Sequence, residues 1–245
     1  MAELSRLHAE AMRLARKKIS ESLAGKDAYL MQAVKSLDDL NDSFNIMSER
    51  LAEWYAIHYP DNKLRPIELL EHILERPDEC GTSGMGAPMT PEDTAAIQGV
   101  ALSAKAIYWQ RKALEAYIEN IMAEIAPNLS KVMGTTLGAR LIAQAGSLEK
   151  LARMPASSIQ VMGAGEALFK HLRSGTPSPK HGLIYKHPLI LGAPKRARGK
   201  IARMLAGKAA IAARVDFYSG ETIDFGDLKA KASAIKGRSK GGKKP

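Results

Sequence analysis

The sequence predicts an all-α protein that consists of a long antiparallel coiled-coil hairpin and a compact helical C-terminal domain. Aromatic side chains make up only 5% of the 245 residues, too few for a β-sandwich or a barrel. Apolar residues recur in two seams with heptad spacing, and shorter segments punctuated by glycine and proline follow them. The length allows one large domain or two modest ones.

The two seams are the strongest structural signal. Their members are spaced alternately three and four residues apart, which is the heptad pattern of a coiled coil. The first seam is Leu30, Ala33, Leu37, Leu40, Phe44, Met47, Leu51 and Trp54, and the second is Ile97, Val100, Ala104, Ile107, Arg111, Leu114, Ile118, Ile121 and Ile125. Two seams of similar length predict an antiparallel hairpin. Two helices of an ordinary bundle are the alternative.

The connector from Pro60 to Pro91 predicts a structural tip on this hairpin. A short helical pattern covers residues 66–75, and Thr90 followed by a proline and two acids predicts a capped helix start. The glycine-rich stretch CGTSGMGAP lacks the Lys-Ser/Thr that a phosphate-binding loop requires. We therefore assign residues 1–128 to the hairpin domain, with a tip insertion at 60–91.

Shorter helices rich in Ala and Gly follow the second seam. Pro155 indicates one helix start, and the small-residue turn Gly163-Ala164-Gly165 indicates another. In the basic run 195–214 we expect the apolar residues and the next valine to face a core; these are Ile201, Met204, Leu205, Ile211 and Val215. The compact domain is predicted over 129–226, and residues 227–245 are predicted to form a basic flexible tail.

Positive charge is concentrated in one segment. The chain has a net charge of +10, and no Asp or Glu lies between Ala167 and Val215. This distribution indicates a polyanionic partner, either nucleic acid or an anionic membrane surface. Lys and Arg neutralise phosphates, His and Arg stack on unpaired bases, and a turn of small residues lets backbone N–H groups approach a phosphate. A solvated basic face is the alternative, although such a face usually interleaves acids.

Other functions find little support. His171, His181 and His187 have no nearby Cys or carboxylate to complete a zinc site. No nucleophile motif occurs, so we expect no enzymatic activity, no cofactor and no metal. The single Cys80 excludes an internal disulfide, and no apolar stretch approaches eighteen residues. We expect a soluble intracellular protein without a membrane partner.

Six motifs in a fixed order resemble those of a known family. They are RLAEWYAIHYP (50–60), GMGAPMTPED (84–93), LEAYIENIMAEIAPNLS (114–130), LGARLIAQAGSLEKLARMPASSIQVMGAGEALFK (137–170), HGLIYKHP (181–188) and GKIARMLAGKAAIAARVD (199–216). On these motifs the chain resembles the Nop family, the scaffold proteins of archaeal box C/D ribonucleoproteins with eukaryotic nucleolar and spliceosomal relatives. The resemblance covers nearly the whole chain.

The resemblance implies a coiled-coil domain that pairs two copies, and a Nop domain that binds a composite surface. That surface is a kink-turn of the box C/D guide RNA together with the small ribosomal-type protein bound to it. In the family, catalysis of 2′-O-methylation on rRNA or tRNA belongs to fibrillarin, which a separate N-terminal domain recruits. This chain begins almost at the coiled coil, so we expect fibrillarin as a partner only where that domain is supplied elsewhere. An archaeal protein would then be cytoplasmic and a eukaryotic one nucleolar.

Individual RNA contacts are also implied by the resemblance. It places Arg153 near RNA, His181 against a flipped-out base, Arg203 and Arg214 on the RNA backbone, and Lys170 beside the stem. Charge, helical spacing and the small-residue turn add further positions. The complete predicted RNA-binding set is Arg153, Gly163, Ala164, Lys170, His171, Arg173, Lys180, His181, Lys195, Arg196, Arg198, Lys200, Arg203, Lys208 and Arg214.

The predicted dimerisation set comes from the two seams. It is Leu37, Leu40, Phe44, Met47, Ile107, Leu114, Ile118 and Ile121.

One departure from the family pattern is Glu166, which stands where relatives usually have lysine, so a phosphate contact is in doubt there. The alternatives are a basic RNA- or DNA-binding protein that needs no protein co-partner, and a structural coiled-coil protein whose basic half adds solubility.

Overall fold

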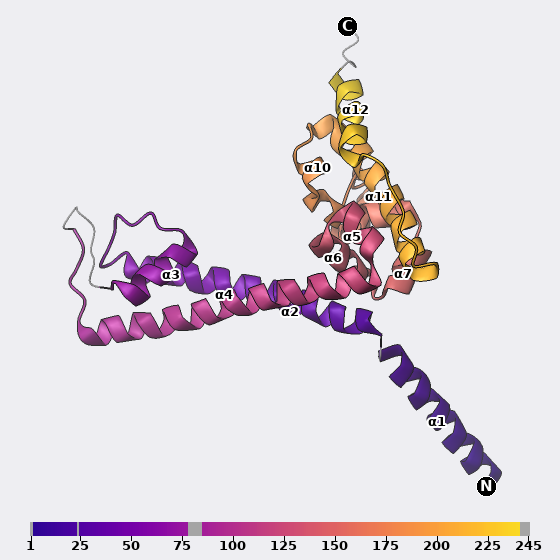
Figure 1. The fold of residues 1–245 in the computed structure, drawn as a ribbon, viewed down its shortest axis with the longest axis horizontal. Helices are drawn as coiled ribbons and strands as arrows, with labels where there is room; N and C mark the ends of the chain where they lie inside the picture. The colour runs from indigo at the N-terminus through magenta and orange to yellow at the C-terminus, as the bar shows by residue number, and fades with distance from the viewer. Residues whose placement is uncertain (1, 24, 78–84, 241–245) are drawn as a thin grey trace. The chain divides into compact units, whose positions relative to one another are not determined.

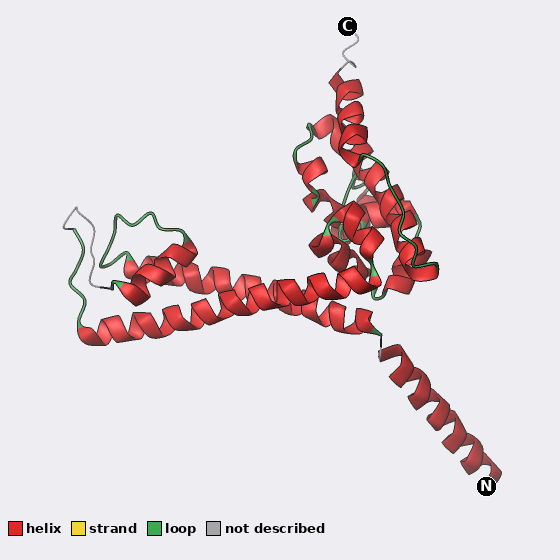
Figure 2. Ribbon diagram, viewed as in Figure 1, coloured by secondary structure: helices red, strands yellow, loops and turns green. Residues whose placement is uncertain are grey.

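The structure, a computed structural model, describes residues 2–23, 25–77 and 85–240. All regular elements in these ranges are helices, which confirms the predicted all-α class (Figure 2). None of these helices is long and apolar enough to cross a membrane. Cys80 and the first glycines of the glycine-rich stretch lie outside the described residues.

The chain divides into two compact units. Unit 1 comprises Met1–Val34 and Ile118–Pro245, and unit 2 comprises Lys35–Tyr117. Two long helices, α2 (Lys26–Tyr55) and α4 (Pro91–Ile125), contribute residues to both units (Figure 1).

Unit 2 is a pair of antiparallel helical segments closed by the short helix α3 (Pro66–Glu75), which confirms the predicted helix at 66–75. The ring centroids of Phe44 and Tyr108 lie 5.7 Å apart, and Tyr55, the last residue of α2, belongs with Phe44 and Ile97 to one core cluster. The charged member of the second seam, Arg111, places its guanidinium 5.0 Å from the Phe44 ring centroid. A cation–π contact therefore accommodates this charge inside an apolar seam.

Helix α4 starts where the sequence predicts. The Thr90 hydroxyl accepts a hydrogen bond from the Asp93 backbone N–H at 3.2 Å, and the Asp93 carboxylate accepts one from the Thr90 N–H at 3.1 Å. This reciprocal pair is a capping box with aspartate in the acidic position, and Pro91 opens the helix.

Unit 1 is organised around helix α11 (Lys195–Tyr218). The helices α5 (Pro127–Met133), α7 (Leu148–Arg153), α8 (Ala156–Val161), α10 (Pro188–Leu191) and α12 (Leu228–Lys240) pack against it. Helix α6 (Thr135–Ala145) packs on α5 and α7, and the 3₁₀ helix η1 (Leu183–Lys186) packs on α8. Helices α1 (Ala2–Leu23) and α9 (Gly165–Ser174) complete the unit; α9 buries none of its residues.

The buried face of α11 differs from the predicted one. Ile201 and Leu205 are fully buried as expected, but Ile211 is 45% exposed, so its predicted core position is wrong. Alanines occupy most of the buried face instead, namely Ala197, Ala202, Ala206, Ala209, Ala210, Ala212 and Ala213. Because alanine has a small side chain, neighbouring helices can approach the α11 backbone closely along this face.

The predicted flexible tail is wrong for residues 228–240, which form α12. Ala232 is buried, and the Lys236 ammonium donates a hydrogen bond to the Gly192 carbonyl at 3.1 Å. The Lys231 ammonium donates to the Phe225 carbonyl at 2.9 Å. The local contact of Lys231 and the distant contact of Lys236 stabilise a helix whose composition suggested disorder.

A buried polar cluster joins the C-terminal end of α11 to the start of α5. The Asp216 carboxylate accepts hydrogen bonds from the backbone N–H groups of Asn128 and Leu129, at 3.0 and 2.8 Å. The fully buried Asn128 amide donates to Asp216 and to the Glu221 carbonyl, and its oxygen accepts from the Ile223 N–H. The carboxylate thus satisfies two free N–H groups at the first turn of α5.

Candidate nucleic-acid interface

A backbone clamp holds the segment 180–183 against the end of α8. The Gly182 N–H donates to the Gln160 carbonyl at 2.9 Å, and the Leu183 N–H donates to the Met162 carbonyl at 2.7 Å. The Gln160 side chain completes the clamp by donating to the Lys180 carbonyl at 2.7 Å. A Cβ atom on Gly182 would lie 2.0 Å from the Met162 oxygen, so only glycine permits this approach.

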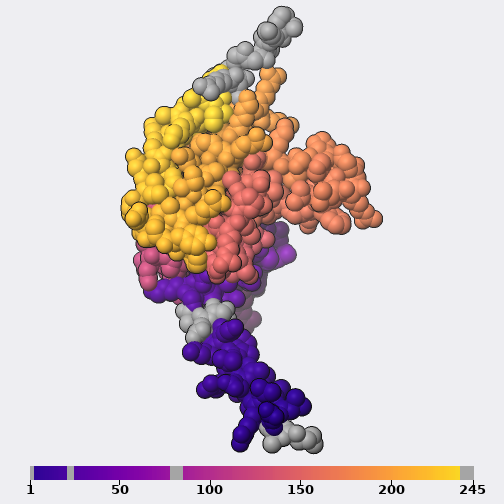
Figure 3. All heavy atoms as spheres, turned by 90° about the vertical axis from the view of Figure 1, so that its right-hand side faces the viewer, coloured from indigo at the N-terminus to yellow at the C-terminus, as the bar shows by residue number. Residues whose placement is uncertain are grey.

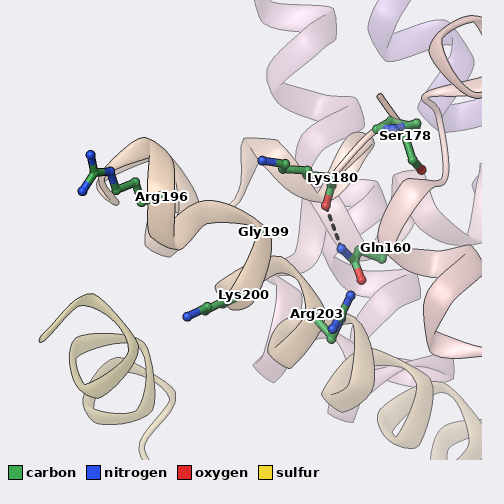
Figure 4. A pocket seen from close by; sticks show the side chains of 8 residues that line it. Gln160, Ser178, Lys180, Arg196, Gly199, Lys200 and Arg203 are labelled. Atoms are coloured by element: carbon green, nitrogen blue, oxygen red, sulfur yellow. Dashed lines mark hydrogen bonds between the residues drawn. The ribbon is translucent and has the colours of Figure 1, made fainter. Parts of the chain in front are cut away.

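The clamp helps to form a hollow of about 440 Å³ between this segment and α11 (Figure 4). Four of its lining residues are cationic: Lys180, Arg196, Lys200 and Arg203. The other lining residues are Gln160, Ser178, Pro179 and Gly199, so no acid lines this hollow. We call it the cationic groove.

Helical spacing explains why three of these cations line the same groove. Arg196, Lys200 and Arg203 follow each other at steps of four and three residues, so they lie on one face of α11. All three, and Lys180, are exposed, and no hydrogen bond or ion pair joins their charged groups to the described part of the chain. Closely spaced cations with free N–H donors form a surface that can neutralise several phosphates.

His181 lies next to Lys180 and stacks on Tyr185, with ring centroids 4.6 Å apart and an interplanar angle of 22°. Burial lowers the pKa of His181, and the nearby charges of Arg198 and Lys180 lower it further. The ring is therefore neutral at pH 7 and offers a flat aromatic surface rather than a charge.

Arg198 holds the Tyr185 ring of this stack in place. Its guanidinium donates to the Ala193 carbonyl at 2.9 Å and to the Tyr185 hydroxyl at 3.0 Å, and it lies 5.4 Å from the Tyr185 ring centroid. These contacts occupy Arg198 within the chain and fix the ring on which His181 stacks.

Two other predicted arginines also have partners within unit 1. The Arg214 guanidinium donates to the Ala152 carbonyl at 3.0 Å and to the Met154 carbonyl at 3.4 Å, beside the end of α7. Arg153 forms an ion pair with Glu149, one turn earlier on α7. Both side chains stay exposed, so each can also meet a phosphate.

The predicted residues on α9 lie apart from the cationic groove. Figure 3 shows this helix and the loop after it, in salmon, standing out from the surface of unit 1. Lys170 and Arg173 are exposed, and His171 contacts the Thr176 carbonyl. Gly163 and Ala164 line a separate hollow at the start of α9, together with Glu166.

The last two predicted cations lie on α11 but outside the groove lining. Lys195 is exposed in the first turn, and the half-buried Lys208 places its ammonium 5.9 Å from the Phe225 ring centroid. The structure thus gathers four of the fifteen predicted residues in one groove and distributes the others over α7, the turn before α9, α9 itself, the segment before η1 and the rest of α11.

Sequence reasoning missed three residues of this region: Gln160, Ser178 and Tyr185. Tyr185 lies in the motif HGLIYKHP, four residues after His181, which was the available signal. Gln160 also lies in a motif, that of residues 137–170, but its contact with Lys180 depends on the fold, and Ser178 lies in none of the six motifs. In the described part of the chain, no group of three His, Cys, Asp or Glu residues could hold a metal ion.

The predicted dimerisation residues are buried or half-buried within a single copy of the chain. Leu37, Phe44, Ile118 and Ile121 are buried, and Leu40, Met47, Ile107 and Leu114 are half-buried. In this conformation the four buried side chains have little surface left for a second copy.

Helix α4 carries another seam with heptad spacing that is exposed along its length: Leu102, Ala106, Trp109, Ala113 and Ala116. We call this the outer seam.

Comparison with known proteins shows that the chain is similar to the members of one family. The family described as "Nop: snoRNA binding domain, fibrillarin" matches residues 70–235. A NOP5 family protein of Methanocaldococcus jannaschii is 40% identical over 247 residues, covering 89% of this chain and 58% of that protein. Nucleolar protein 58 of Candida glabrata is 36% identical over 246 residues, covering 90% of this chain and 48% of its own length. The chain spans about half the length of the curated relatives it matches.

A solved structure is also similar. A chain in the crystal structure of a fibrillarin/Nop5p complex matches with a TM-score of 0.55 and 28% identity. The match covers 96% of this chain and 77% of that chain.

Proposed function

Because this chain belongs to the Nop family, we propose that it is a non-catalytic, RNA-binding scaffold of a box C/D ribonucleoprotein. The observation that carries the proposal is the cationic groove, where Lys180, Arg196, Lys200 and Arg203 surround one hollow without an acid. The groove has the charge and the donors to hold an RNA backbone, and the neutral His181 ring beside it can stack on an unpaired base.

The finer proposal is that unit 1 binds a kink-turn RNA together with the small protein that binds kink-turns. The separation of the predicted cations supports a large, composite partner. α9 stands out from unit 1 with its exposed Phe169 and Leu172, whereas the groove lies between segment 178–180 and α11. Apolar side chains on α9 suit a protein surface, and the cations of the groove suit phosphates.

Unit 2 is proposed to pair two copies of the chain. The outer seam supports this proposal, because Leu102 and Trp109 are 58% and 60% exposed at positions seven residues apart. A second antiparallel helix pair could bury this seam by heptad packing. The residues that mediate pairing are then those of the outer seam rather than the buried members of the first set.

In the solved complex, a chain similar to this one assembles with fibrillarin. We propose that the scaffold supports guide-directed 2′-O-methylation and that fibrillarin performs the chemistry. The relative from Candida glabrata is named a nucleolar protein, so a eukaryotic chain would act in the nucleolus and an archaeal one in the cytoplasm.

A titration of a labelled kink-turn RNA tests the proposal. The chain should bind the RNA weakly on its own and tightly once the kink-turn-binding protein is present. Arg203→Gln should weaken binding to the assembled complex by about tenfold, since it removes a charge-assisted contact. The matched control is Lys105→Gln in unit 2, which should leave binding unchanged. Equal affinity for naked RNA and for the protein-bound RNA would favour a general nucleic-acid binder instead.

A further inference from the structure

Unit 2 contains a small pocket of about 150 Å³ at the end of α2. It lies where the segment before α4 crosses the last turn of α2, and its lining includes Trp54, Ile57, His58, Met89, Asp93 and Ile97. Sites for metabolites or drugs are usually at least twice as large, so a pocket of this volume suits a single side chain.

We call this the tip pocket, and close contacts fix its walls. The Ala87 N–H donates to the Ile57 carbonyl at 2.9 Å, and the Ala87 carbonyl lies 2.8 Å from the His58 Nδ1 atom. A Cβ atom on Gly86 would lie 1.6 Å from the His58 oxygen, so the two backbones are as close as glycine allows. A pocket held in this way is formed before a ligand arrives.

The protonation of His58 follows from its geometry. A carbonyl oxygen only accepts hydrogen bonds, so Nδ1 must carry the hydrogen that it donates to Ala87. In the neutral ring, Nε2 is then an acceptor. That atom is buried and has no hydrogen-bond partner in the described structure, and the whole residue is only 9% exposed. A buried acceptor without a donor is costly.

Asp93 supplies a second acceptor. One of its carboxylate oxygens accepts from the Thr90 N–H and hydroxyl, at 3.1 and 2.6 Å. These hydrogen bonds lower the pKa of Asp93, so the carboxylate stays charged at neutral pH. No hydrogen bond to its other oxygen occurs among the described residues.

The surroundings favour a cation. Unit 2 has 8 Lys and Arg against 14 Asp and Glu, a net charge of −6. The half-buried Trp54 adds the aromatic ring that attracts a cation most strongly. A guanidinium has five N–H donors and no acceptor, stacks on aromatic rings, and is attached to an aliphatic stem that suits Ile57 and Met89.

We propose that the tip pocket is a binding site for an arginine side chain presented by a partner protein. The guanidinium would stack on Trp54 and donate hydrogen bonds to the Asp93 carboxylate, while its stem contacts the apolar wall. The RNA-binding groove belongs to unit 1, so this site would give the scaffold a second, protein-directed contact that is independent of RNA.

Tryptophan indole signals offer a direct test, because the chain has only two tryptophans. In ¹H–¹⁵N spectra of the full chain, titration with N-acetyl-arginine-N-methylamide should shift the Trp54 indole signal and leave that of Trp109 in place. Trp109→Phe assigns the two signals. The neutral isostere N-acetyl-citrulline-N-methylamide should bind at least about tenfold more weakly, since it lacks the charge. This comparison uses the unchanged chain, so it does not depend on the folding of a variant.

Two variants and one further probe sharpen the test. Asp93→Asn should weaken arginine binding by about tenfold, whereas Glu92→Gln, its neighbour in the first turn of α4, should not. The lysine analogue should bind more weakly than arginine, because an ammonium cannot stack on Trp54 as a planar group does. Equal binding of arginine and citrulline, or equal shifts at both indoles, would overturn the proposal. So would a Trp54 shift on dilution that arginine does not compete with, because a second copy of the chain would then fill the pocket.

Discussion

The two units of this chain differ most in charge. Unit 1 has 28 Lys and Arg against 12 Asp and Glu, a net charge of +16, whereas unit 2 has a net charge of −6 from 8 against 14. A polyanion is therefore attracted to unit 1 and repelled by unit 2. The chain's overall +10 hides this division. We infer that unit 1 binds RNA and that unit 2 makes protein contacts.

The units also differ in how they use apolar residues. Unit 1 buries alanines on α11 and leaves cations on the opposite face of the same helix. Unit 2 buries two apolar seams between its helices and still exposes a third, the outer seam, on α4. Exposed apolar surface in a regular pattern indicates a protein partner, as exposed cations indicate a nucleic acid.

The largest effect is expected from removing the buried polar cluster of unit 1. Asp216→Ala deprives the N–H groups of Asn128 and Leu129 of their acceptor and should lower the free energy of unfolding by about 3 kcal/mol. Denaturant unfolding measures this change. Hydrogen exchange should show it in unit 1, with the core amides of unit 2 unaffected. Asp42→Ala, an exposed aspartate on α2, is the matched control and should change stability by less than about 0.5 kcal/mol.

The next effect concerns pairing through unit 2. Trp109→Glu places a charge in the outer seam and should weaken dimerisation by about 2 kcal/mol, roughly thirtyfold, because the carboxylate cannot be buried unpaired. Sedimentation at several concentrations measures the dimer fraction. Ile46→Glu on α2 is a control, because that residue is 67% exposed outside the seam. If both variants dimerise like the unchanged chain, the outer seam is not the interface.

A smaller effect is expected at the stacked histidine of unit 1. His181→Ala should weaken binding to the kink-turn complex by about 1.5 kcal/mol, since one stacked ring is lost. His181→Phe keeps an aromatic surface and should restore most of the affinity. A gel shift with the assembled complex measures both. Equal loss in both variants would show that the ring does not act by stacking.

The smallest effect is a pH dependence of stability. Burial lowers the pKa of His187, as it does for His181, so folded unit 1 binds these protons less readily than the unfolded chain does. The free energy of unfolding should therefore fall as the pH decreases through the ordinary histidine pKa of about 6.5. His187→Asn keeps an acceptor at the start of α10, where the Nδ1 atom accepts from the Leu189 N–H. This variant should show a weaker pH dependence; an unchanged one would contradict the assignment.

Local patterns predicted the parts of the fold that depend on neighbours in sequence. The heptad spacing identified the regions of α2 and α4, and Thr90 identified the start of α4, because helix period and capping are set within a few residues. The composition of residues 228–240 was misleading for the opposite reason. Helix α12 is stabilised by distant contacts such as that of Lys236 with Gly192, which no local pattern records.

The candidate site shows the same limit. Charge and helical spacing found Arg196 and Lys200, and the family resemblance found Arg203; one helix face brings the three together. The position of Lys180 beside them depends on the clamp between Gln160 and Gly182, which joins residues far apart in sequence. Sequence reasoning also could not show that Arg198 and Arg214 already have partners within the chain, because those partners are backbone carbonyls of other elements.

The salt dependence of RNA binding tests the central claim most directly. Each phosphate contact adds about 0.7 to 0.9 to the slope of log Kd against log salt concentration. Replacing Arg196, Lys200 and Arg203 together with Gln should therefore lower the slope by about 2 to 3, whereas replacing Lys35, Lys63 and Lys105 of unit 2 should leave it unchanged. A slope that stays the same without the three groove cations, or that falls equally in both variants, would contradict the assignment of RNA binding to unit 1.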